Sequence, residues 1–301
     1  MLQINYVRQN VDAVKERLAV KNFGDLSLVD KVVSLDEQVR KLKAESETLQ
    51  ATINAASKEI GMMMGKGEKE LAEQKKQEVA AQKNTIQQLN DQLTVVEKEL
   101  HDELVKLPNL PHLSVPKGKI PADNEVVREG GVKPNLYAAA VPHWDLIRTY
   151  DLVDFETGVK LTGSGFPLYK GKGAKLQRAL IQYFLDHNTA AGYTEYLPPL
   201  MVNEASAYGT GQLPDKEGQM YHATADNFYL IPTAEVPLTN IYRDVIVKEN
   251  EVPVKMTGYT PCFRREAGSF GSDVRGLNRV HQFDKVEIVQ LVHAEKSYDV
   301  L

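Results

Sequence analysis

The sequence contains little of what marks a secreted or membrane-bound protein. Its 301 residues include a single cysteine, Cys262, which excludes an internal disulfide and a cysteine-based zinc site. No apolar run approaches the ~20 residues that a membrane helix needs. Residues 1–5 lack the basic-then-apolar pattern of a signal peptide. We therefore expect a cytoplasmic protein without a membrane partner, in which Cys262 is a packed small hydrophobic residue rather than a nucleophile.

The sequence also lacks a recognisable metal set and a phosphate loop. Its histidines, such as His222, His281 and His293, are not spaced as metal ligands, and we predict no metal held by the protein alone. Residues 170–175 lack the spacing and the Lys-Ser/Thr end of a Walker A motif, so we interpret them as a turn before a helix over 174–191. The net charge of −5 argues against nucleic-acid binding by overall charge but leaves a local basic face open.

Long helical seams are the clearest periodic signal. Mostly apolar residues alternate steps of four and three over 28–60 and again over 79–107, which is typical of a coiled coil. Three glycines within 61–67 indicate a turn, and Pro108 ends the second seam. The pattern predicts an antiparallel hairpin whose first helix is roughly 50 Å long at ~1.5 Å per residue. Residues 1–20 also show helical spacing.

Periodicity alone leaves the partner of each seam open. A coiled coil that holds two chains together explains the heptads as well as an intramolecular pair does, and the glycine-rich turn favours the pair within one chain. Lysines along the hairpin are interleaved with slightly more acidic residues. Charge therefore does not predict RNA binding by the hairpin.

The rest of the chain differs from the hairpin in composition and in residue pattern. Residues 111–141 contain several prolines and glycines and are typical of a linker, which separates a hairpin arm at 1–110 from a domain at 142–301. In that domain, helical spacing at 144–150 and 174–191 is mixed with short β-prone runs. We therefore predict an α+β fold: a helical hairpin, then a largely antiparallel sheet with flanking helices.

A strand–loop–strand segment holds the residues with the most chemical meaning. A β-prone run over 257–263 leads into Arg264 and Glu266, a glycine-rich loop covers 267–276, and a second strand returns over 280–291. Side chains two residues apart share one face of a strand, so this face offers a cation for a phosphate and an acceptor for an amine. An isolated Arg-x-Glu is most simply a surface ion pair. The apolar neighbours and the glycine-rich loop favour a binding site here.

The longer string resembles a known family of enzymes. Phe-Arg-x-Glu before a loop and a returning strand is similar to motif 2 of class II aminoacyl-tRNA synthetases. The full string over 263–287, including Glu-Ala-Gly-Ser, Arg-Gly-Leu-x-Arg-Val-His-Gln-Phe and Lys-Val-Glu, resembles the seryl-tRNA synthetases. Residues 192–200 are similar to motif 1, the dimer-interface element, and 232–235 to the serine-binding Thr-x-Glu loop. The hairpin is similar to the family's tRNA-reading arm, so the resemblance covers essentially the whole chain.

The resemblance implies a role for each matching residue. Arg264 is the expected catalytic residue, which neutralises the α-phosphate of ATP and holds the serine carboxylate beside it. Glu266 is expected to accept from the adenine amino group, and Phe283 to stack on the ring. The implied ATP-binding residues are Arg264, Arg265, Glu266, Val280 and Phe283, and the implied L-serine-binding residues are Thr233, Ala234, Glu235 and Glu287. Thr233 and Glu235 would hold the ammonium group, and Glu287 would face the serine end of the pocket.

The reaction that the family catalyses suits these residue types. The serine carboxylate attacks the α-phosphorus and pyrophosphate leaves, which requires positioning and charge neutralisation more than acid–base catalysis. ATP is the expected nucleotide substrate, and Mg²⁺ would bridge its phosphates. The resemblance implies a serine–tRNA ligase acting on tRNA(Ser), and also on tRNA(Sec), as a homodimer whose helical arm binds the tRNA.

One part of the family pattern is missing from the sequence. Family members continue into motif 3, which carries a second arginine for the γ-phosphate of ATP, whereas this chain ends at Leu301. We expect the chain to be part of a longer protein and leave the activity of the 301 residues alone open. Alternative functions are a non-catalytic coiled-coil interaction protein derived from a synthetase, and a synthetase-like ligase that charges a carrier protein. The missing motif supports the first, and the long arm argues against the second.

Overall fold

The computed structural model describes residues 2–215, 217–266 and 275–301. It divides the chain into two compact units, Met1–Gly131 and Val132–Leu301. The predicted fold class is confirmed, because a helical hairpin comes first and antiparallel strand pairs with flanking helices follow. Within the described ranges, none of the helices combines the length and apolar character that crossing a bilayer requires.

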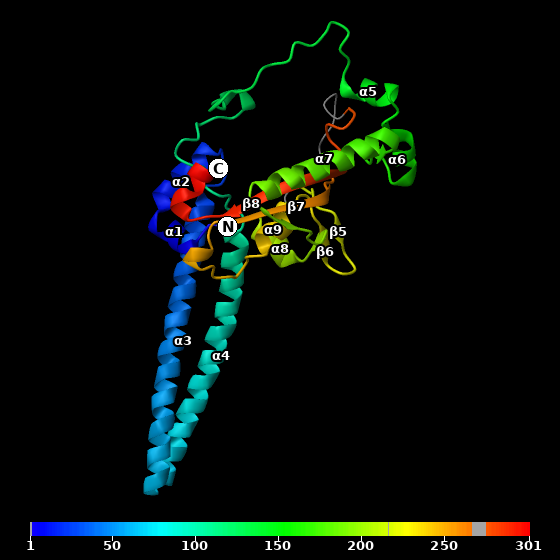
Figure 1. The fold of residues 1–301 in the computed structure, drawn as a ribbon. Helices are drawn as coiled ribbons and strands as arrows, with labels where there is room; N and C mark the ends of the chain where they lie inside the picture. The colour runs from blue at the N-terminus through cyan, green and yellow to red at the C-terminus, as the bar shows by residue number, and fades with distance from the viewer. Residues whose placement is uncertain (1, 216, 267–274) are drawn as a thin grey trace. The chain divides into compact units, whose positions relative to one another are not determined.

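The first unit is built on an intramolecular pair of long helices. α3 (Ser27–Lys66) and α4 (Lys69–Leu104) run side by side in opposite directions (Figure 1). Their contact face is the predicted seam, and it includes the buried side chains of Val39, Ile53 and Val79. The ion pair of Lys43 with Glu97 at 2.6 Å joins the helices outside the seam, and Lys31 pairs at 2.8 Å with Glu103, a position of the second seam. The hairpin therefore closes its apolar stripes against each other within one chain.

The turn of the hairpin lies at the end of the predicted glycine-rich segment 61–67. α3 continues through Gly61 and Gly65 and ends at Gly67, whose φ of +82° caps the helix in the left-handed conformation. A glycine inside a helix costs about 1 kcal/mol relative to alanine, and the packing of the paired seams offsets this cost. With 40 residues, α3 is about 60 Å long at ~1.5 Å per residue, longer than predicted.

A small core closes the base of the arm. The predicted helical segment over residues 1–20 is helical, but it is divided at Asn10 (φ −133°) into α1 (Ile4–Gln9) and α2 (Val11–Val20). This core contains buried residues from α1, α2, the start of α3, the end of α4 and the segment just after it, namely Val7, Val14, Leu18, Leu28, Val29, Val32, Leu104 and Leu107. The base therefore does not depend on the middle of the arm.

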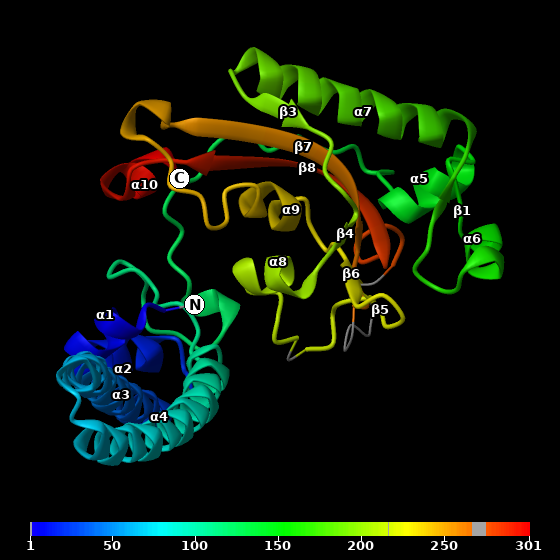
Figure 2. The same ribbon diagram turned by 90° about the horizontal axis from the view of Figure 1, so that it is seen from below.

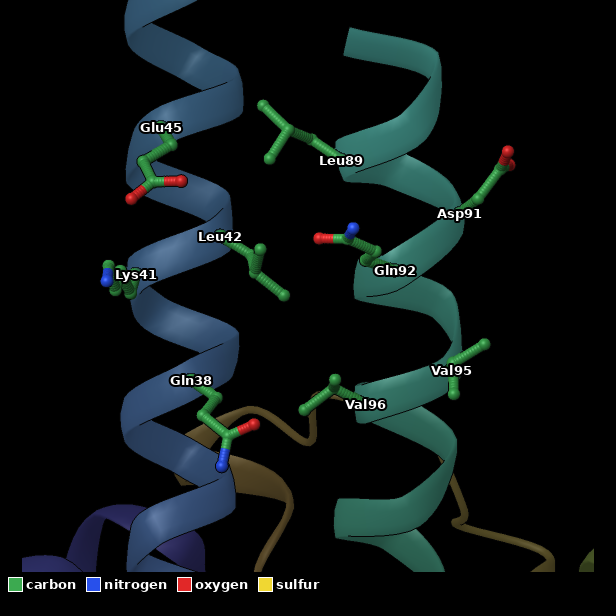
Figure 3. Close-up of a pocket in the computed structure, with 9 residues that line it drawn as sticks. All are labelled: Gln38, Lys41, Leu42, Glu45, Leu89, Asp91, Gln92, Val95 and Val96. Carbon is green, nitrogen blue, oxygen red and sulfur yellow. The ribbon is translucent and has the colours of Figure 1, made fainter. Parts of the chain in front are cut away.

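The middle of the arm is less tightly closed than its base. Figure 3 shows Leu42, Leu89 and Val96 directed into the gap between the helices, where a groove of about 690 Å³ opens. Nearer the tip, Gln82 places a buried side-chain oxygen in the seam, without a hydrogen-bond donor among the described residues. The groove belongs to the interface between α3 and α4.

Two long strands dominate the second unit. β7 (Val254–Phe263) and β8 (Gln282–Leu291) pair antiparallel over their whole length. In this register Glu287 lies opposite Gly258, and Phe283 lies opposite Cys262. Because alternate side chains of a strand share a face, residues 283, 285 and 287 point to the same side of the sheet.

The flanking elements cover both faces of this strand pair. α7 (Gly171–Ala190) packs on one face and α9 (Glu235–Asn240) on the other (Figure 2). β3 (Thr194–Tyr196) adds to β7 in parallel, so the sheet is mixed along this edge. α7 begins at Gly171, within the segment 170–175 that was predicted to be a turn. Gly173 lies in the first turn of this helix, and a side chain at that position would collide with the Leu152 carbonyl.

A smaller sheet leads the chain into the candidate site. Its strands have the order β4 (Met201–Val202), β6 (Phe228–Leu230) and β5 (His222–Ala223), all antiparallel. β6 is followed within a few residues by α9, so residues 231–234 cross from one element to the other. Among the described residues of the unit, the remaining elements are α5 (His143–Thr149), β1 (Val153–Asp154), α6 (Phe155–Leu161), β2 (Leu168–Tyr169), α8 (Glu204–Gly209), α10 (Ser297–Val300) and the 3-10 turns η2 (Glu249–Glu251) and η4 (Ala294–Lys296). The 3-10 turn η1 (Pro121–Asp123) belongs to the first unit.

Candidate active site

Arg264 is held where β7 ends beside the start of β8. Its backbone N–H donates to the His281 carbonyl at 2.9 Å, and its side-chain Nε donates to the Pro232 carbonyl at 3.3 Å. The guanidinium carbon lies 5.1 Å from the ring centroid of Phe283. The strand pair and the segment after β6 thus fix a planar cation next to an aromatic face, a geometry suited to a phosphate or a carboxylate.

Thr233 and Glu287 meet on the same side of the sheet. The Thr233 hydroxyl donates to Glu287 Oε2 at 2.8 Å and accepts from the Glu235 backbone N–H at 3.2 Å. Thr233 is only 4% exposed, and Glu287 lies opposite Gly258 in the strand pair. The result is a partly buried carboxylate and hydroxyl that can accept hydrogen bonds from an amino acid.

Lys285 completes this cluster, although it was not among the residues predicted from the sequence. Its Nζ lies 3.3 Å from Thr233 Oγ1 and 3.7 Å from Glu287 Oε2. It also lies 5.9 Å from the Phe283 ring centroid. The alternation of a β-strand could have identified it, because it stands between two predicted residues on one strand face.

The other predicted serine residues are placed differently. Ala234 is fully buried, so its side chain is part of the packing, and Glu235 is exposed at the first position of α9. The structure therefore brings Thr233 together with Glu287 in a direct contact, while it places Glu235 next to them along the chain.

The predicted ATP residues fall into two groups. Arg264 and Phe283 form the cation–aromatic contact, whereas Glu266 and Val280 line a neighbouring cavity of about 960 Å³. The Glu266 carboxylate accepts from the Arg279 guanidinium at 3.0 Å. Arg265 is exposed, and its backbone N–H donates to the Gln219 carbonyl at 2.9 Å. Most of the glycine-rich loop, residues 267–274, lies outside the described residues.

Polar contacts on the opposite face tie β8 to α7. The Tyr259 hydroxyl donates to Asp284 Oδ1 at 2.7 Å, and the Gln177 amide of α7 donates to the other carboxylate oxygen. Burial and the Asp284 carboxylate raise the pKa of Tyr259, which keeps its hydroxyl a donor. Because Asp284 lies between Phe283 and Lys285 in sequence, these bonds fix the strand that carries the site residues.

Among the described residues, Cys262 is not placed as a nucleophile and the acidic side chains do not form a metal site. Cys262 is packed in the interior, as predicted, and burial raises the pKa of its thiol above the ordinary value. In the part of the chain that the structure describes, no three His, Cys, Asp or Glu side chains gather as a metal site. The site therefore consists of an arginine, a lysine, an aromatic ring and hydrogen-bond acceptors.

Comparison with known families identifies the class to which this architecture belongs. Residues 220–301 match the tRNA synthetase class II core domain (G, H, P, S and T), which includes the β7–β8 pair and the site residues. Residues 1–111 match the seryl-tRNA synthetase N-terminal domain, which includes the arm. The fold is that of a class II aminoacyl-tRNA synthetase.

Individual relatives narrow this class to one family. The serine–tRNA ligase of Trichlorobacter lovleyi is 47% identical over 300 residues, covering 99% of this chain and 69% of that protein. The serine–tRNA ligase of Salinibacter ruber is 46% identical, covering 100% and 70%. The crystal structure of seryl-tRNA synthetase from Pyrococcus horikoshii, complexed with ATP, has a TM-score of 0.87 at 31% identity and covers 100% and 71%. The chain belongs to the seryl-tRNA synthetase family, a family of aminoacyl-tRNA ligases.

Proposed function

We propose that this chain activates L-serine with ATP and transfers the seryl group to tRNA(Ser), and also to tRNA(Sec), within the full-length protein. The observation that carries the proposal is the contact of Thr233 with Glu287 on the same strand face as Phe283, with Arg264 against the Phe283 ring. Amino-acid acceptors and a phosphate-binding cation therefore lie side by side. Family membership supports the substrate class.

In the activation step, a serine carboxylate oxygen bonds to the α-phosphorus as the bond to the β-phosphate oxygen breaks. Pyrophosphate leaves, and seryl-adenylate remains. Arg264 neutralises the charge that gathers on the α-phosphate and the carboxylate, and its bond to the Pro232 carbonyl keeps it in place. Phe283 stacks on the adenine, Val280 lines the base, and Glu266 accepts from the adenine amino group. Arg265, which follows β7, contributes through its backbone N–H, which donates to the Gln219 carbonyl.

Recognition of serine uses the acceptors beside this arginine. Thr233 and Glu235, with Ala234 between them, hold the ammonium group, and Glu287 faces the hydroxyl group. Alanine has no hydroxyl and leaves the Glu287 carboxylate without that donor, which costs roughly 1–3 kcal/mol or more.

The site residues fit a metal that arrives with the nucleotide. The described residues contain no cluster that could hold one by itself, and Mg²⁺ is commonly held by substrate phosphates with few protein carboxylates. Bound there, Mg²⁺ would neutralise phosphate charge. Arg264 and Lys285 supply the protein's own positive charge near Phe283.

The transfer step gives the arm its role. Residues 1–110 bind the tRNA through α3 and α4, residues 111–141 link the arm to the rest, and residues 142–301 form part of the catalytic domain. A reach of about 60 Å suits a partner as large as tRNA and exceeds what a small carrier protein needs. The protein acts in the cytoplasm, where aminoacylated tRNA is used in translation.

A homodimer is the proposed assembly. The outer face of α7 exposes Leu176 (55%), Leu180 (47%) and Tyr183 (62%), spaced as one stripe of a helix, and a second copy of this chain would cover it. Replacing Leu180 with aspartate should weaken dimerisation at least about tenfold, because it places a charge in an apolar contact. Sedimentation velocity measures this effect, and a monomeric wild-type protein would contradict the proposal.

The proposed activity predicts that serine supports ATP–pyrophosphate exchange by the full-length protein. Exchange with alanine should be at least about 100-fold weaker in kcat/KM, because the Glu287 carboxylate then lacks the donor that the serine hydroxyl supplies. Exchange with a different amino acid and not with serine would contradict the assignment. ATP binding without exchange with any amino acid would favour the non-catalytic interaction protein, and charging of a small carrier in place of tRNA would favour the carrier ligase.

A further inference from the structure

Lys285 occupies both acceptors that a serine molecule needs. Its Nζ donates to Thr233 Oγ1 at 3.3 Å and forms an ion pair with Glu287 Oε2 at 3.7 Å. Thr233 and Glu287 are also joined directly at 2.8 Å. One protein cation therefore lies where the ammonium and hydroxyl groups of serine would have to bind.

The lysine and a substrate ammonium cannot share this position. Both are cations, and two ammonium groups around one partly buried carboxylate repel each other. Thr233 is nearly inaccessible to solvent, which limits screening there. Serine binding therefore requires Lys285 to move.

A second position for the ammonium of Lys285 is close by. Its Nζ lies 5.9 Å from the Phe283 ring centroid, and the Arg264 guanidinium lies 5.1 Å from the same centroid. The serine carboxylate and the α-phosphate meet beside this arginine in the proposed reaction. The flexible four-carbon stem of a lysine can reach from one position to the other, whereas the planar guanidinium of Arg264 is tied to the Pro232 carbonyl.

We propose that Lys285 is an internal substitute for the substrate cation. Before serine binds, its Nζ holds Thr233 and Glu287 in place, and serine displaces it toward the carboxylate and the α-phosphate. The proposal rests on the proposed function, because it takes serine as the ligand. It implies that ATP strengthens serine binding, since the phosphate favours the displaced position of Lys285, and that the coupling is reciprocal.

The test uses Lys285→Met in the full-length protein and serinol as the probe. Serinol carries the ammonium and hydroxyl groups of serine but no carboxylate, so losing an attraction between Lys285 and the carboxylate cannot mask the result. The variant should bind serinol at least fivefold more tightly than the wild type in calorimetry. The kcat of serine-dependent pyrophosphate exchange should instead fall at least tenfold, because a cation beside the α-phosphate is lost.

Matched variants separate this effect from a general loss of charge or structure. Lys255→Met removes a lysine of β7 whose Nζ lies 5.6 Å from the Tyr193 ring centroid, and it should change neither quantity. Lys285→Arg keeps a cation and should not gain serinol affinity; Lys285→Gln replaces the methionine variant if that variant does not fold. Unchanged or weaker serinol binding in a folded neutral variant would overturn the proposal. Absence of serine-dependent exchange in the wild type would instead refute the proposed function, and the serinol comparison would still report on Lys285.

Discussion

Replacing Arg264 with alanine is expected to abolish seryl-adenylate formation and to leave the fold intact. The guanidinium is the cation that faces the developing charge, and losing one such preorganised donor typically costs about 100- to 1,000-fold in kcat. A bidentate arginine that also holds the carboxylate should lie at the upper end, at about 1,000-fold or more. Because the Arg264 backbone makes the contact with His281, the strand pair should keep its register. Pyrophosphate exchange measures the activity, and thermal unfolding measures the fold.

Neighbouring variants show whether this loss is specific. Arg264→Lys keeps a charge but not the planar pair of donors, so an intermediate loss is expected. Arg265→Ala removes an exposed side chain, and the contact of this residue with the Gln219 carbonyl is made by its backbone N–H. Because this side chain is not the cation that faces the developing charge, kcat should fall by no more than about tenfold. Exchange at the wild-type rate in Arg264→Ala would show that the site is misassigned.

Shortening the arm is expected to separate the two steps of the reaction. Joining Arg40 to Glu97 through a short glycine–asparagine turn removes the outer arm and retains the apolar core at its base. The ion pairs of Lys31 with Glu99 and Glu103 also remain. The kcat/KM of tRNA aminoacylation should fall by about 1,000-fold or more, which corresponds to the loss of about 4 kcal/mol of binding free energy. Serine-dependent pyrophosphate exchange should change less than about twofold, because the catalytic residues are not altered.

The position of the cut follows from the packing of the base. Deleting all of 28–107 would remove Val32 and Leu104 from the core with α1 and α2, so misfolding would be confused with loss of tRNA binding. A folded short-arm protein that loses both activities would contradict the proposed separation of roles. One that charges tRNA normally would show that the arm does not bind it.

Local sequence patterns predicted some elements well and others poorly. The seam residues were predictable because heptad spacing is set along one chain, and the same spacing now buries Val39, Ile53 and Val79. The position of the turn within 61–67 was not, because glycine propensity is weak beside the packing of two long helices, and only Gly67 adopts a left-handed conformation there. Similarly, helical spacing within 1–20 did not reveal the break at Asn10.

The candidate site was also predictable from the sequence only in part. Motif resemblance selected Arg264, Phe283, Thr233 and Glu287, and the structure places these residues on one strand pair and the segment beside it. Motif resemblance did not select Lys285, because a sequence motif specifies residue types and their order but not which side chains are in contact. Nor did it indicate that Glu266 is paired with Arg279.

The sequence by itself determined the helical arm, the strand–loop–strand and the family, because periodicity and motif spacing are properties of neighbouring residues. Only the tertiary structure decided that Lys285 reaches Thr233, 52 residues away, and that Thr233 reaches Glu287, 54 residues away. Contacts between residues so far apart in the sequence depend on how β8 pairs with β7 and on where the chain leaves β6 and runs to α9. Strand register and packing set these positions together, so the charge arrangement that should govern serine binding emerges only in the folded protein.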